Sequence, residues 1–403
     1  MLHIIDKVLK VEDIVQFVIN VDAENETIAM IVKNEVVKCL RKEQLNSNDF
    51  EIAQAHLDII WEKLHTGHWQ DVKDCFRTLY AVVSVLKIVI ILHISKDIDN
   101  ALLIDLMKIC DMGIMMGNCI MNNNLSKLAM IFTNELAPSD ITDIKELPIK
   151  RPKLEYSSIL GRFENVTKLI NHQDIIIEKF KKESDKAYPF LLDAEVNDWP
   201  AMEWTFEFFQ SKYGHRFVPI EIGKRYTDET WTQTLMPLGK FIEEYIENAK
   251  PKNTGYLAQY TLLRQFDELN NDYITPVFCY NAKDEFTDLQ PHIWLGPKGT
   301  VSPLHTDPRK NLFCQIVGRK HVILFPENQT EFLSPHESNL LNNTSQINLD
   351  EDLNDILEKF PKFKNAKGYE TVIQPGEALY IPPFCWHFVK SLEKSISLNF
   401  WFD

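Results

Sequence analysis

The sequence predicts an α+β protein with an all-helical N-terminal part and a C-terminal part built of short strands. In the first 140 residues, apolar side chains recur at helical spacing, as at Ile14, Val15 and Val18, and glycine is scarce. From Tyr188 onward, aromatic residues and prolines become frequent. Turn sequences such as Gln-Pro-Gly-Glu at 374–377 then separate short apolar segments, which is typical of a β-sandwich or barrel.

Residues 1–145 are predicted to form a helical interaction domain of stacked helical hairpins. Their most apolar segment, residues 79–94, is short for a membrane span and contains Lys87 and His93. We therefore expect a buried core helix and no membrane partner. No side chain in this region indicates catalysis, so packing or partner binding is its predicted role.

Residues 146–164 are predicted to be a linker, because two prolines and three basic residues fall within residues 148–153. A nuclear localisation signal and an exposed polar linker explain this cluster equally well. The seven cysteines show no C-x-x-C spacing, which favours a reducing compartment over a disulfide framework or a zinc site. The predicted location is the nucleus, the cytoplasm or both.

The formal net charge of −15 favours some classes of binding partner over others. Binding to phosphate backbones needs clustered Lys and Arg, so we expect no direct contact with nucleic acid. An acidic surface attracts basic proteins, such as ribosomal or chromatin-associated proteins. We expect a monomer.

A histidine and a carboxylate form the centre of the predicted site. His305 and Asp307 lie two residues apart in strand-like sequence, where side chains at i and i+2 share a face. His387 follows in a second aromatic, strand-like segment. Two imidazoles and one carboxylate on one face of a metal suit non-haem Fe(II) and oxygen chemistry. On its own, a His-x-Asp pair is more often a hydrogen-bonded surface pair.

The surrounding segments resemble the jumonji C oxygenases over about residues 165–403. The resembling segments are residues 218–223, 225–229, 255–259, 294–297, 299–308, 318–320, 335–336, 341–346, 358–363 and 375–387. The resemblance implies that residues 165–403 form an oxygenase domain. It also implies that this domain is a double-stranded β-helix of the jelly-roll and cupin kind, with decorating helices.

The resemblance further implies a set of cofactors and the residues that hold them. His305, Asp307 and His387 match the family's catalytic Fe(II) ligands, and 2-oxoglutarate and O2 are the implied co-substrates. Lys320 matches the lysine that pairs with the distal carboxylate of 2-oxoglutarate, since a buried carboxylate needs a charged partner. The other matching co-substrate contacts are Tyr256, Ser302 and Asn311. Tyr260 lies four residues beyond Tyr256, and the sequence does not choose between them.

For the substrate, the resemblance implies a protein arginyl hydroxylase acting at carbon 3. Trp294 and Trp401 match positions that line the family's pocket, although both also suit a plain aromatic core. Glu221 is a charge within an apolar segment, which suits either a bidentate pair with a guanidinium or a solvent-facing strand position. The alternative is a histone lysine demethylase, whose pocket would hold a methylated cation among aromatic rings. A further alternative is a non-catalytic scaffold.

Overall fold

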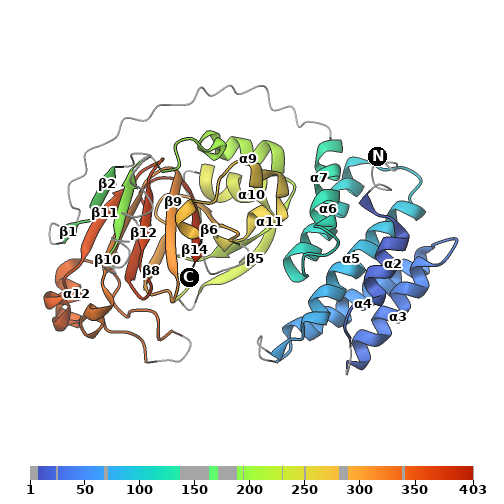
Figure 1. Ribbon diagram of the computed structural model, residues 1–403, viewed down its shortest axis with the longest axis horizontal. Helices are drawn as coiled ribbons and strands as arrows, with labels where there is room; N and C mark the ends of the chain where they lie inside the picture. Colours follow the sequence, from blue (N-terminus) through green and yellow to red (C-terminus); the bar gives the residue numbers. More distant parts are fainter. Residues whose placement is uncertain are drawn as a thin grey trace.

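The computed structural model describes residues 8–23, 26–67, 71–136, 163–170, 188–193, 195–228, 230–248, 251–280, 289–337 and 341–402. A helical domain and a β-rich domain lie side by side along the longest axis of the molecule (Figure 1). Most of the predicted linker, and the predicted boundary at residue 145, fall outside the described residues.

Helices alone make up the first domain in the residues described. They are α2 (Val11–Ile19), α3 (Thr27–Leu40), α4 (Ser47–His65), α5 (Asp74–Ile94), α6 (Asn100–Met116) and α7 (Asn124–Glu135). Polar side chains fix where two of them begin. Asn46 and Asp49 form a capping box at α4, and the Asp99 side chain accepts a hydrogen bond from the Leu102 amide at α6.

Helix α5 is the core of the helical domain, as the sequence predicts. Its length and mean hydropathy would suffice to cross a membrane, yet most of its side chains are buried against neighbouring helices. Ile88 and Ile90 are fully buried, whereas Lys87 is half-buried and donates to Gln54 on α4. An apolar side chain is needed on nearly every face because α5 packs against α3, α4 and α6 together.

The second domain consists of two sheets, the double-stranded β-helix that the family resemblance implies. The five-stranded sheet has the order β1 (Glu164–Asn165), β11 (Tyr369–Ile373), β10 (Lys320–Phe325), β13 (Trp386–Ser391) and β8 (Val301–His305). The nine-stranded sheet has the order β2 (Thr167–Ile170), β3 (Phe190–Asp193), β12 (Ala378–Ile381), β9 (Lys310–Val317), β14 (Ser395–Phe402), β7 (His292–Gly296), β6 (Gly255–Tyr260), β4 (Phe217–Ile222) and β5 (Thr232–Pro237).

Short helices cover one end of the nine-stranded sheet, and one more lies within the segment that connects β10 to β11 (Figure 1). They are α9 (Phe206–Tyr213), α10 (Leu238–Phe241) continuing into a π-helical turn (Ile242–Glu247), α11 (Leu262–Gln265) and α12 (Leu353–Lys359). Single 3-10 turns occur at Pro200–Glu203, Asp267–Asn271, Val277–Cys279, Glu327–Phe332 and Pro361–Asn365. The rings of Tyr213 and Phe266 stack at 4.3 Å and join α9 to the segment after α11.

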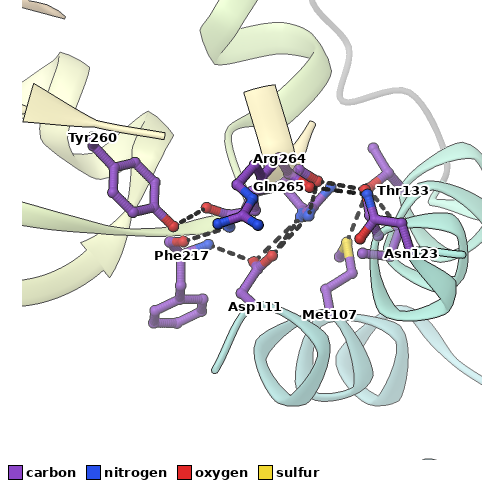
Figure 2. Close-up of polar contacts among 11 residues, drawn as sticks. Met107, Asp111, Asn123, Thr133, Phe217, Tyr260, Arg264 and Gln265 are labelled. Atoms are coloured by element: carbon purple, nitrogen blue, oxygen red, sulfur yellow. Dashed lines mark hydrogen bonds and ion pairs between the residues drawn. The ribbon is translucent and has the colours of Figure 1, made fainter. Parts of the chain in front are cut away.

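The two domains are joined by buried polar contacts between α6 and the start of β4. Asp111 on α6 and Arg216, directly before β4, form an ion pair with Nη2 2.7 Å from Oδ1, and both side chains are at most 1% exposed. The other carboxylate oxygen of Asp111 accepts the amide of Phe217 at 2.8 Å. Figure 2 shows this cluster between the α6 helix and the β-rich domain. A buried charge that is paired and hydrogen-bonded in this way holds the two surfaces in one arrangement.

Candidate active site

The three predicted metal ligands converge at one point between the two sheets. His305 is the last residue of β8, His387 is the second residue of β13, and these two residues are direct partners across the antiparallel pair. Asp307 lies two residues past the end of β8 rather than within it. One ligand atom from each of the three lies within 4.8 Å of the others, so the set is placed to hold a metal ion.

Backbone carbonyls orient both imidazoles toward that point. Nδ1 of His305 lies 2.7 Å from the Pro303 carbonyl, and Nδ1 of His387 lies 2.9 Å from the Cys385 carbonyl. A carbonyl oxygen only accepts, so each Nδ1 carries the proton and each Nε2 keeps its lone pair for a metal. Burial and the neighbouring His305 lower the pKa of His387, which keeps this imidazole in the neutral form that binds metal.

The third ligand, Asp307, is held by a tryptophan. Nε1 of Trp401 on β14 donates to Oδ2 of Asp307 at 3.2 Å, and the same oxygen lies 3.7 Å from Nε2 of His387. The backbone carbonyl of Asp307 accepts the Phe384 amide at 2.7 Å. Trp401, predicted as a pocket residue, therefore also orients a predicted metal ligand.

Lys320 lies at the floor of the same pocket, on the first residue of β10. Its side chain is 1% exposed and its Nζ donates to the Tyr256 hydroxyl at 3.2 Å. Burial lowers the pKa of Lys320 to about 7, and no carboxylate pairs with it in the described part of the chain. The turn before it requires Gly318, whose φ is +71° and where a Cβ would lie 2.1 Å from the Lys394 carbonyl oxygen.

The structure chooses between the two tyrosines that the sequence left open. Tyr256 lines the pocket and contacts Lys320, and its ring lies 5.7 Å from that of Trp294. The Tyr260 hydroxyl instead donates to Gln265 at 2.8 Å, on the side that faces the helical domain. Of the two tyrosines, Tyr256 is the one that lines the pocket with His305, Asp307 and His387.

Ser302 and Asn311, the other two residues predicted to contact the co-substrate, line the same pocket. Asn311 is buried and its Oδ1 accepts from Nδ2 of Asn399 on the neighbouring strand at 3.0 Å. Oδ1 of Asn399 is itself buried and has no hydrogen-bond partner in the part of the chain that the structure describes. A buried acceptor without a donor costs about 1–3 kcal/mol, so the Asn399 amide oxygen is a polar group that the described part of the chain leaves unsatisfied at the pocket.

The predicted substrate residues are at the pocket, though Glu221 is only beside it. Trp294 and Trp401 line the cavity. Glu221 is the direct partner of Tyr256 across β4 and β6, and its Oε2 accepts from Nε1 of Trp231 at 3.3 Å. Burial raises the pKa of the Glu221 carboxyl, while the Trp231 N–H opposes this shift. The carboxylate is thus half-desolvated and only partly hydrogen-bonded.

Among the described residues, five that line the pocket were not predicted from the sequence as site residues: Gln259, Phe313, Ile381, Val389 and Asn399. Gln259 lines the pocket with a left-handed backbone, φ 48°, at a bulge between β6 and β7. The Tyr226 hydroxyl lies 3.1 Å from the Thr344 hydroxyl. Burial raises the pKa of Tyr226, and the nearby carboxylates of Asp307 and Glu221 raise it further. Asn399 had a usable signal, since it is a polar side chain that alternates with Leu398 and Phe400 in an apolar strand.

Comparison with known proteins places this arrangement in a family. Residues 178–403 match the family described as "Cupin-like domain", and residues 26–142 match "KDM8-like, N-terminal ARM repeats". The chain is 35% identical to zebrafish "Lysine-specific demethylase 8" over 91% of this chain and 93% of that protein. The chain belongs to the cupin-like jumonji C oxygenases. It is also 32% identical to Drosophila "Jumonji C domain-containing protein 5", covering 87% and 86%, and 28% identical to Arabidopsis "Lysine-specific demethylase JMJ30", covering 95% and 93%.

Family membership agrees with the donor set in the pocket. Jumonji C proteins are dioxygenases that use Fe(II), 2-oxoglutarate and O2, and the His305, Asp307 and His387 cluster suits Fe(II). The buried Lys320 side chain donates to Tyr256 and has no carboxylate partner among the described residues, which suits one carboxylate of 2-oxoglutarate. The helical domain consists of ARM-type repeats. The sequence predicted stacked helical hairpins there but no particular type of repeat.

Proposed function

We propose that the protein is a protein hydroxylase that oxidises carbon 3 of an arginine side chain. One atom of O2 becomes the new hydroxyl, the other enters succinate, and 2-oxoglutarate loses CO2. When bound, the iron supplies the oxidation of the C–H bond. The observation that carries the choice of arginine is the half-buried Glu221 carboxylate beside Tyr256.

The residues of the pocket would divide the work of binding. Lys320 and the Tyr256 hydroxyl would bind the distal carboxylate of 2-oxoglutarate, with Ser302 and Asn311 as further polar contacts. His305, Asp307 and His387 would hold Fe(II) through Nε2, a carboxylate oxygen and Nε2. Because only these three side chains would hold the metal, it would remain accessible to the co-substrates.

Glu221 favours arginine for a reason of geometry and charge. A guanidinium offers parallel N–H donors that match the two oxygens of a carboxylate. Only Oε2 of Glu221 has a partner among the described residues, the Trp231 N–H. An arginine would neutralise this half-buried carboxylate, whereas a trimethylated lysine has no N–H to donate.

Lysine demethylation is the second candidate, and the names of the relatives favour it. The zebrafish and Arabidopsis proteins are both called lysine-specific demethylases. The rings of Trp294, Trp401 and Tyr256 line the pocket, and aromatic rings attract methylated ammonium groups. Both reactions oxidise a C–H bond next to the same iron site, so the two differ only in the side chain that the pocket presents. Demethylase activity would also favour basic chromatin proteins as partners and a nuclear location.

The experiment that tests the proposal compares arginine and methyl-lysine peptides in one mixture with wild-type protein and Glu221→Gln. We expect oxygen gain on arginine in the wild type and a fall of about ten- to a hundredfold in its kcat/KM in the variant, because a charged bidentate pair is lost. Trp231→Phe removes the N–H donor to Glu221 and keeps an aromatic ring and the Glu221 charge, so this matched control should retain arginine turnover. Methyl loss from lysine that is insensitive to Glu221→Gln would replace the proposal with demethylation.

A further inference from the structure

A chain of buried, hydrogen-bonded side chains starts at Lys320 on the floor of the active-site pocket. Lys320 Nζ donates to the Tyr256 hydroxyl at 3.2 Å. Burial raises the pKa of this hydroxyl, whereas a hydrogen bond with the Thr300 side chain lowers it. The Thr300 hydroxyl donates to Ser391 Oγ at 2.7 Å, and Ser391 Oγ lies 3.0 Å from Ser395 Oγ. The last three side chains are buried, and none of the three lines the pocket itself.

The hydroxyl chain crosses from one sheet to the other at the Lys320 end of the pocket. Lys320 and Ser391 are direct partners on β10 and β13 of the five-stranded sheet, so their side chains share a face. Tyr256 and Ser395 belong to β6 and β14 of the nine-stranded sheet. Thr300, directly before β8, connects the two sets. The chain therefore begins and ends around the lysine that the pocket presents.

The backbone around the hydroxyl chain fixes its geometry. The Ser391 amide donates to the Thr300 carbonyl at 3.0 Å, and the Gly299 amide donates to the Ser391 carbonyl at 2.8 Å. Gly296 ends β7 at the point where Tyr256 and Thr300 meet. A Cβ on this glycine would lie 2.6 Å from Tyr256 Cδ2 and 3.1 Å from Thr300 Cγ2. The absence of a side chain there lets the tyrosine and the threonine approach each other.

The hydroxyl chain suits a tyrosine that has to bind a carboxylate. An ammonium group only donates, so the Tyr256 oxygen accepts from Lys320 and keeps its own proton for another acceptor. A carboxylate only accepts, so the Tyr256 hydroxyl binds one by donating that proton. Thr300 can then donate to the tyrosine oxygen, because a hydroxyl can exchange its donor and acceptor roles. A donor on the tyrosine oxygen also strengthens the hydrogen bond that the tyrosine donates.

We infer that Thr300, with Ser391 behind it, is a positioning residue that directs the Tyr256 hydroxyl toward the distal carboxylate of 2-oxoglutarate. This inference rests on the part of the proposed function that assigns this carboxylate to Lys320 and Tyr256. It does not depend on which side chain is oxidised. Because Thr300 acts through Tyr256, its loss should affect the co-substrate and leave the metal ligands unchanged.

The test is calorimetric titration of 2-oxoglutarate into the full chain with Fe(II) under anaerobic conditions, where turnover stops because O2 is a co-substrate. Thr300→Val removes the hydroxyl at nearly constant volume and should weaken 2-oxoglutarate binding about three- to tenfold, as expected for one net hydrogen bond. Thr300→Ser keeps the hydroxyl and should stay within about twofold of the wild type. Ser391→Ala acts one step further along the chain and should weaken binding about two- to threefold.

Pyruvate, a 2-oxo acid without a distal carboxylate, separates positioning from a general structural loss. Its affinity in Thr300→Val, measured by competition with 2-oxoglutarate, should equal its affinity in the wild type, and Fe(II) binding should be unchanged as well. Ser397→Ala is the matched control. It removes another buried hydroxyl of β14, which donates to Gln315 at 3.0 Å and lies outside the chain. This variant should bind both acids as the wild type does.

Three outcomes would contradict the inference. Equal weakening of 2-oxoglutarate and pyruvate in Thr300→Val would overturn it, because the loss would then come from general packing. Unchanged 2-oxoglutarate affinity in Thr300→Val, together with weaker binding in Tyr256→Phe, would overturn it and leave the assignment of Tyr256 standing. Unchanged 2-oxoglutarate affinity in Tyr256→Phe would overturn that assignment, and the inference with it.

Discussion

Removing the Asp111 carboxylate should uncouple the two domains. In the structure, Arg216 is 1% exposed, and Asp111 accepts from both its Nε and its Nη2, at 2.9 and 2.7 Å. Asp111→Ala leaves a buried guanidinium without its counter-charge, which costs about 3–5 kcal/mol of folding free energy. The Phe217 amide loses its acceptor as well, and this loss destabilises the start of β4.

The assay is urea unfolding followed by circular dichroism, with hydrogen exchange at β4 reporting on the domain contact. A matched surface control is Glu35→Ala, which removes a pair with side chains 40% and 68% exposed and should change stability by no more than about 1 kcal/mol. The double variant Asp111→Leu/Arg216→Met should recover the part of the loss that comes from the unpaired buried charge, because no guanidinium remains, but not the part that comes from the Phe217 amide. If Asp111→Ala shifts the unfolding curve no more than Glu35→Ala, the argument that this pair joins the domains is wrong.

Three further predictions concern the pocket. Lys320→Ala should raise the 2-oxoglutarate requirement strongly while leaving Fe(II) binding intact, as checked by calorimetric titration of each; an unchanged requirement would place the distal carboxylate elsewhere. Because burial lowers the Lys320 pKa to about 7, the free protein loses this charge as pH rises. The 2-oxoglutarate dissociation constant should therefore increase by up to about tenfold per pH unit above pH 7, and the dependence should vanish in Lys320→Ala. Trp401→Phe removes the N–H on Asp307 and should weaken Fe(II) binding by about ten- to a hundredfold, measured with a competing chelator; unchanged affinity would show that this hydrogen bond does not orient the ligand.

Much of the site was accessible from sequence because its signals are local. His305 and Asp307 are two residues apart, and Lys320 follows a glycine turn between two apolar strands, so spacing and resemblance together found them. The rise in aromatic residues and prolines after Tyr188, with turn sequences between short apolar segments, also predicted that strands replace helices there.

The contacts that join distant segments could not be predicted. Asp111 and Arg216 are separated by 105 residues, and an aspartate within an apolar helix or an arginine before a strand is unremarkable alone. Likewise, Asn399 lies opposite Phe313 and diagonal to Asn311 only because β14 pairs with β9 in one register, and a shift of β14 by one residue would turn Asn399 away from the pocket. Gln259 reaches the pocket through a bulge, which breaks the strand alternation that sequence analysis relies on.

The most direct test of the central claim measures succinate and the mass of an arginine peptide in the same reaction, with Fe(II), ascorbate, 2-oxoglutarate and air. The account predicts that the wild type adds one oxygen to the arginine residue, accompanied by succinate, and that His387→Ala does neither because a metal ligand is missing. Oxygen on arginine with active His387→Ala would contradict the iron site. Succinate without oxygen on arginine, together with formaldehyde from methyl-lysine peptides, would contradict the arginine assignment.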